Sequence, residues 1–96
     1  MIEINLFELV GSFAENKNLA RDIRKEKIIP AIENNQKIIL NFENIDATTQ
    51  SFIHALISDL FRHYGFEILD NISFKSCNEN VKKIINIVVE YMQQSE

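Results

Sequence analysis

The sequence contains few of the residues that form covalent cross-links or phosphate-binding loops: one cysteine, one proline and two glycines among 96 residues. The single cysteine, Cys77, excludes an internal disulfide and a metal site made of cysteine pairs, and this cysteine usage is typical of the cytoplasm. Gly11 and Gly65 stand alone, so the glycine-rich loops that bind phosphates in nucleotide-dependent enzymes are missing.

Long hydrophobic runs and positive charge are also scarce. No apolar stretch approaches the roughly 18–20 residues that cross a bilayer, and residues 1–6 include an acid where a signal peptide has basic residues. The formal net charge of −4 and the pI near 5.1 disfavour contact with the phosphate backbone of DNA or RNA. We therefore expect a soluble, cytoplasmic protein that binds neither nucleic acid nor a membrane.

The hydrophobic content of 46% indicates one core and one domain over residues 1–96, because so short a chain cannot build two cores. Residues 2–7 alternate with a period of two, which predicts a strand over about residues 2–9. The short apolar run 37–42 predicts a middle strand covered on both faces. Residues 66–69 and 72–74 predict further strand structure, either one bent strand or two short ones.

Three other stretches have helical periodicity. The first begins at Lys17 and has an apolar face opposite a basic one; Pro30 predicts a kink or a restart with the proline in a first turn. Asn34 and Asn35 offer the left-handed residue that often closes a helix. The second follows Asp46, Thr48 and Thr49, whose side-chain oxygens can each cap it, and runs to about His63, where Gly65 stops it.

The third helix continues to the C-terminus and is capped by Asn78. Strands and helices thus alternate along the chain, which predicts an α/β domain with a central mixed or parallel sheet, about three helices and right-handed crossovers. Functional loops of such sheets usually lie at the carboxyl ends of the strands. Residues 43–51, between the middle strand and the second helix, occupy that position.

Several segments together resemble a bacterial STAS-like family of unknown function. They are residues 37–45 (Lys-Ile-Ile-Leu-Asn-Phe-Glu-Asn-Ile), the turn Thr48-Thr49-Gln50-Ser51-Phe52 that opens a helix, the upstream helix 20–24, and residues 72–74 before Asn78. The resemblance covers roughly residues 17–90. It implies a STAS-like fold and no catalytic signature.

The STAS-like family is in turn similar to the STAS domains of anti-sigma factor antagonists. Those domains bind a kinase-like ATPase and are switched by phosphorylation of a serine at the start of the corresponding helix, so the resemblance implies a role in protein docking. Gln50 stands where the antagonists have that serine, and Thr49 where they have the preceding acid. The STAS-like family usually has acids where Asn41, His54 and Ala55 stand here, so no role of those acids transfers to this chain.

Two groups of residues are candidate sites. The first is a turn for partner binding or phosphorylation, with ordinary helix capping as the alternative: Asp46, Thr48, Thr49, Gln50, Ser51 and His54. The second is a basic docking face on the first helix, with a merely solvated helix face as the alternative: Lys17, Arg21, Arg24 and Lys25.

Catalysis has weaker support. His54 and Ser58 are four residues apart, but no nucleophile elbow and no orienting acid accompany them, so a surface or half-buried histidine is the alternative. Cys77 precedes a helix, where a thiol pKa can be lowered; the alternative is a half-buried structural cysteine. We expect no catalytic residues, no metal and no cofactor.

These patterns together predict a non-enzymatic regulatory domain that binds a protein through the turn at the start of the second helix. A kinase-like ATPase is the partner implied by the resemblance. A small-ligand sensor for a nucleotide or lipid and a structural subunit of a homo-oligomer are the alternatives. Three helices leave one face of a sheet thinly covered, and a homodimer is one way to cover it.

Overall fold

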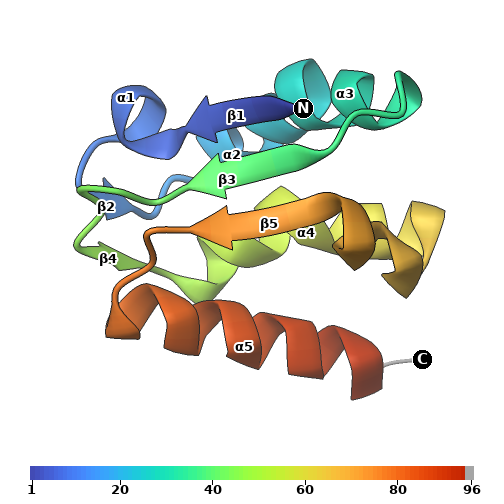
Figure 1. Cartoon of the computed structure of the whole chain (residues 1–96). Coiled ribbons are helices and arrows are strands. Elements are labelled where there is room, and N and C mark those ends of the chain that lie inside the picture. Colours follow the sequence, from blue (N-terminus) through green and yellow to red (C-terminus); the bar gives the residue numbers. More distant parts are fainter. Residues whose placement is uncertain (95–96) are drawn as a thin grey trace.

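A three-stranded parallel sheet forms the centre of the molecule. The computed structural model describes residues 1–94, with β1 (Ile2–Asn5), β3 (Ile38–Asn41) and β5 (Ile72–Lys75) paired in the order β1-β3-β5 (Figure 1). A smaller parallel pair, β2 (Phe13–Ala14) and β4 (Ala47–Thr48), lies beside it. The predicted mixed α/β fold with a parallel sheet is confirmed, and residues 38–41 form its middle strand.

Two predicted strand segments are helical instead. After Asn5 the chain turns into the short helix α1 (Leu6–Val10), because Leu6 and Val10, four residues apart, both face the core. Residues 66–71 form the 3-10 helix η2 (Phe66–Asn71), in which the Phe66 ring packs on Phe61 with centroids 5.2 Å apart. Only residues 72–75 of the predicted C-terminal strand region pair with the sheet.

Long helical segments connect and follow the strands. One connection is continuous: α2 (Lys17–Ile23), the π-helical turn η1 (Arg24–Ile28) and α3 (Ile29–Glu33). Pro30 lies in the first turn of α3 and Asn35 has a φ of 58°, so both predictions for this segment are confirmed. The other two are α4 (Gln50–Tyr64) and α5 (Glu79–Gln94).

The sheet has one helix-covered face and one open face. Paired residues of the three strands share a face, because the strands are in register: Ile2 with Ile38 and Ile72, and Ile4 with Leu40 and Phe74. Figure 1 shows α2 and α4 behind this sheet. The prediction that the middle strand is covered on both faces is wrong at Ile39, which points to the other side and is half-buried. Asn41, on the same side as Ile39, is buried.

Polar side chains occupy the open face. The Glu3 carboxylate accepts a hydrogen bond of 2.8 Å from the Asn41 amide and lies 3.6 Å from the Lys75 ammonium. Glu3 and Ser73, which flank Ile39 in register, are exposed. Such a face offers little apolar area for burial, so it gives the predicted homodimer little driving force, and the homodimer stays a prediction.

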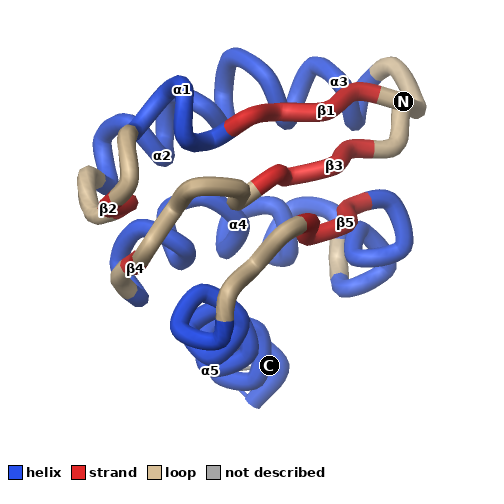
Figure 2. Tube along the Cα trace, turned by 60° about the vertical axis from the view of Figure 1, so that its left-hand side comes forward, coloured by secondary structure: helices blue, strands red, loops and turns tan. Residues whose placement is uncertain are grey.

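Helix α4 is the central helix of the layer. It contacts α2 on one side and α5 on the other, and Figure 2 shows it between them. Its N-cap is Thr49, whose hydroxyl accepts a 3.1 Å hydrogen bond from the Phe52 amide. The helix ends before Gly65, whose φ is 78°. The predicted end at Gly65 is confirmed, and Thr49 is the residue of the predicted turn that caps the helix. The helix buries one continuous apolar face: Phe52, Ile53, Leu56, Ile57, Leu60 and Phe61.

Asn78 joins α5 to the loop that precedes the turn. Its side-chain carbonyl accepts a 2.9 Å hydrogen bond from the Val81 amide, as predicted for the helix cap. Its amide group donates to the backbone carbonyls of Asp46 at 2.9 Å and Ile45 at 3.3 Å. One side chain therefore fixes both the start of α5 and the loop that leads into β4.

Replacing Asn78 should destabilise the fold. Asn78→Ala removes the cap and both loop contacts, so we expect the free energy of unfolding in urea to fall by about 2 kcal/mol. Asn78→Asp keeps the cap acceptor and loses only the donors, so it should lose less. Asn86→Ala, at an exposed position of the same helix, is the control and should stay within about 0.5 kcal/mol. Equal stability of Asn78→Ala and Asn86→Ala would contradict this role.

Candidate functional site

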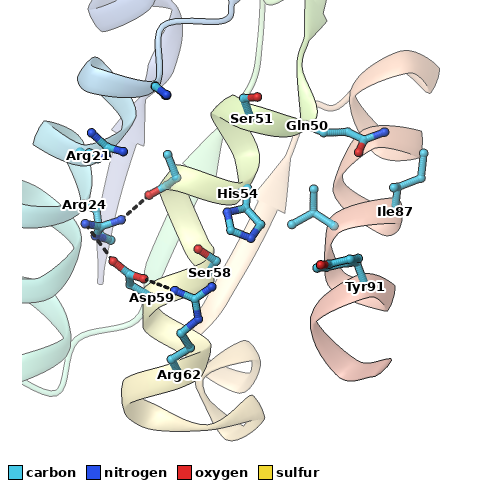
Figure 3. Close-up of a pocket in the computed structure, with 13 residues that line it drawn as sticks. Arg21, Arg24, Gln50, Ser51, His54, Ser58, Asp59, Arg62, Ile87 and Tyr91 are labelled. Atoms are coloured by element: carbon cyan, nitrogen blue, oxygen red, sulfur yellow. Dashed lines mark hydrogen bonds and ion pairs between the residues drawn. The ribbon is translucent and has the colours of Figure 1, made fainter. Parts of the chain in front are cut away.

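A groove of about 540 Å³ lies along α4, between α2 and α5 (Figure 3). Its lining comes from all three helices and the start of η1: Lys17, Arg21, Arg24, Gln50, Ser51, His54, Ala55, Ser58, Asp59, Arg62, Ile87, Val88 and Tyr91. The groove includes residues of both sites that the sequence suggested. Part of the turn and part of the basic face therefore form one surface: Gln50, Ser51 and His54 from the first, and Lys17, Arg21 and Arg24 from the second.

The wall on the α2 side is cationic. Asn16 caps α2 by accepting hydrogen bonds from the amides of Asn18 at 2.9 Å and Leu19 at 3.2 Å, which starts the helix at Lys17. Lys17 and Arg21 are four residues apart and thus lie on one side of the helix. Both are exposed, and among the described residues neither forms an ion pair with an acid.

The floor is the outward stripe of α4. Its residues follow one another at steps of one to four, which places them on one side of the helix. They are Gln50, Ser51, His54, Ser58 and Arg62. Gln50 and Ser51 are exposed, His54 is half-buried and Ser58 is buried. In Figure 3 the His54 side chain extends from α4 between the α2 and α5 walls.

The wall on the α5 side is largely apolar. Ile87 and Tyr91, four residues apart, are 36% and 61% exposed, and Val88 between them is buried. The Tyr91 ring meets His54 edge to face, with ring centroids 6.5 Å apart. Tyrosine is enriched at protein interfaces relative to the rest of the surface.

Arg24 was predicted as part of an exposed basic docking face, and for this residue the prediction is wrong, as is the alternative of a solvated face. Only 7% of this residue is exposed, because its guanidinium donates to the backbone carbonyl of Ala55 and lies 3.1 Å from the Asp59 carboxylate. Asp59 also pairs with Arg62 at 3.1 Å. Arg24 begins the π-helical turn η1, and such turns are frequent at functional sites. The main effect of the Arg24 side chain is to hold α2 against α4.

Half of the predicted turn lies outside the groove. Thr48 is buried, with its hydroxyl donating to the Ala14 carbonyl at 2.8 Å, so it supports the β2–β4 pair and does not form part of the surface. Thr49 caps α4. Asp46 is exposed, but it is not among the groove residues. Lys25 lines a neighbouring cavity of about 460 Å³ instead.

The charges of the groove are unbalanced. Four cationic side chains line it with one carboxylate, Asp59, which is already shared by Arg24 and Arg62. Lys17 and Arg21 are therefore left uncompensated on a chain whose formal net charge is −4. The groove can attract an anionic group and can bury an apolar one beside it.

Other chemistry has little support among the described residues. No three His, Cys, Asp or Glu side chains within residues 1–94 come together to hold a metal ion. Burial raises the pKa of the Cys77 thiol, against a smaller opposing effect of Lys82, so the reactive-thiol alternative is not supported. Within the same residues no helix is long and apolar enough to cross a membrane.

Sequence reasoning missed Asp59, Arg62 and the α5 wall. Asp59 and Arg62 continue the spacing of Ser51, His54 and Ser58, so the polar stripe of α4 contained a signal that could have found them. Ile87 and Tyr91 belong to the ordinary apolar pattern of α5. Nothing in that pattern distinguishes a residue at a groove from a residue in the core.

Comparison with known proteins gives one match. The model of a family described as a STAS-like domain of unknown function matches residues 19–82, about two thirds of the chain. This range includes most of α2 and all of α4, and it ends near the start of α5. Neither a curated protein nor a solved structure gives a significant match.

Arg24 should contribute strongly to stability. Arg24→Ala removes the buried guanidinium and its contacts with Ala55 and Asp59, so we expect the free energy of unfolding to fall by about 2 kcal/mol or more. Arg62→Ala removes an exposed arginine from the same carboxylate and should change the free energy of unfolding by less than about 1 kcal/mol. Urea denaturation of both variants gives the comparison. Similar losses for the two would contradict the assignment.

Proposed function

The chain belongs to the family of STAS-like domains of unknown function, and we propose that it is a non-enzymatic regulatory domain that docks onto a partner protein through its groove. The observation that supports this most is the union of two surfaces. Gln50 and Ser51, from the turn by which the sequence resembles STAS domains, lie in the same groove as Lys17 and Arg21.

The residue types of the groove support a protein partner. Tyrosine and arginine are enriched among the residues that dominate binding energy in protein interfaces. Tyr91 and Arg21 are exposed on opposite walls, and Ile87 is exposed beside Tyr91. A partner that covered both walls would bury the aromatic ring, which is a usual source of affinity at the centre of an interface. A carboxylate of that partner would pair with the guanidinium and offset the cost of its desolvation.

The same geometry favours binding over catalysis. A catalytic histidine needs a partner that orients its ring, and the one carboxylate in the groove lining is held by two arginines. Ser58, the hydroxyl four residues after His54, is buried. The resemblance to anti-sigma factor antagonists makes a kinase-like ATPase the first partner to test.

Small-ligand sensing is the second candidate. The groove volume of about 540 Å³ falls within the roughly 300–1,000 Å³ of small-molecule pockets. A ligand that binds only the folded chain would raise the melting temperature, by an amount that grows with the logarithm of the ligand concentration above its Kd. A nucleotide or lipid that raises the melting temperature of the wild type but not of Tyr91→Ala, with no protein partner retained, would favour sensing over docking.

Truncating the apolar wall tests the docking proposal. Tyr91→Ala should weaken partner binding by at least about tenfold, because it removes the largest exposed apolar side chain of the groove. Phe13→Ala removes a 50% exposed aromatic side chain that is not part of the groove, so it should leave binding unchanged.

The measurement uses immobilised wild-type and variant chains, incubated with a lysate of the cells that produce the protein. Quantitative mass spectrometry then compares the proteins that each chain retains, and titration of the retained partner gives the affinities. Retention of a partner equally by the wild type and Tyr91→Ala would contradict docking through this groove. So would the absence of any protein retained by the wild type.

A further inference from the structure

We propose that the groove selects an acidic, amphipathic segment of its partner, with carboxylates on one side and apolar side chains on the other. This inference rests on the proposed docking function and specifies the chemistry of the docked segment. It follows from the different character of the two walls. Lys17 and Arg21 form one wall, and Ile87 and Tyr91 form the other.

The cationic wall determines where a negatively charged segment can approach. The chain as a whole has a formal net charge of −4, so its overall field opposes an acidic partner. The groove attracts such a partner, because its one carboxylate is already paired with Arg24 and Arg62 and Lys17 and Arg21 remain exposed. Lys17 and Arg21 therefore direct an acidic segment to the α2 side of the groove.

The apolar wall requires that the segment be amphipathic. Ile87 and Tyr91 lie across α4 from Arg21 (Figure 3), so a segment in the groove meets charge on one side and apolar surface on the other. An amphipathic helix presents two such sides, and docking of a helix into a groove is a recurring mode of recognition. The floor from Gln50 to Arg62 spans about 18 Å at 1.5 Å per residue, enough for about three helical turns.

Other anionic ligands fit this surface less well. DNA and RNA binding depends on neutralising many phosphates, and the groove has only two cations without an acidic partner among the described residues. A free phosphate could pair with the exposed Lys17 and Arg21, but it would leave Ile87 and Tyr91 uncovered. A peptide with both kinds of side chain matches both walls.

The test is a selection from a random peptide library displayed on phage, with the immobilised full chain as the target. Peptides retained by the wild type but not by Tyr91→Ala are the groove binders. We expect these peptides to have a net negative charge, with apolar residues at helical spacing of three and four. We also expect their binding to weaken as salt is added, because exposed charges are screened.

Charge reversal then identifies the cationic wall. Arg21→Glu should weaken binding of the selected peptides by roughly tenfold, through loss of one attraction and gain of one repulsion. Lys37→Glu changes the net charge by the same amount at an exposed residue away from the groove, so it should have little effect.

The outcomes separate this inference from the proposed function. Groove binders without an excess of acidic residues, or bound equally by Arg21→Glu and the wild type, would overturn the acidic segment and leave docking intact. If no peptide distinguishes the wild type from Tyr91→Ala, docking through the groove fails and this inference fails with it. Acidic amphipathic peptides that are lost with Arg21→Glu and kept with Lys37→Glu support it.

Discussion

The burial of one face of α4 is the interaction on which the rest of the structure depends. Its apolar residues fill the space beneath the sheet, and α2 and α5 pack on its two sides. The remaining stripe, from Gln50 to Arg62, is left facing outward and becomes the floor of the groove. A single helical period thus builds the core and the candidate binding surface together, so a change that rotated α4 would disturb both.

The walls of the groove depend on how the neighbouring helices are held. Arg24 ties α2 to α4 through the Ala55 carbonyl and Asp59, while Asn78 sets the start of α5 and secures the loop that precedes β4. The buried Arg24, placed at the start of the π-helical turn, fixes the spacing of α2 and α4. The residues that position the groove are therefore mostly distinct from those exposed in it.

Much of the fold could be predicted from the sequence, because its signals are local. Thr49 and Asn78 satisfy free amides at helix starts, and Pro30 marks a first turn. The strand predictions for the segments of α1 and η2 were wrong. In a stretch of five or six residues, contacts with the core decide the secondary structure more than the pattern of the segment itself does. The groove was predicted only in pieces. Residues of α2, α4 and α5 meet there through tertiary packing that no spacing in the sequence records.

The most direct test of the groove as the binding surface is the amide correlation spectrum of the full, isotope-labelled chain during titration with a peptide that the groove retains. We predict that the largest shifts map to Ser51, His54 and Ile87, which line the groove. The open face of the sheet lies away from the helix layer that forms the groove. Largest shifts at Glu3 and Ser73 on that face, with the groove unchanged, would contradict the account.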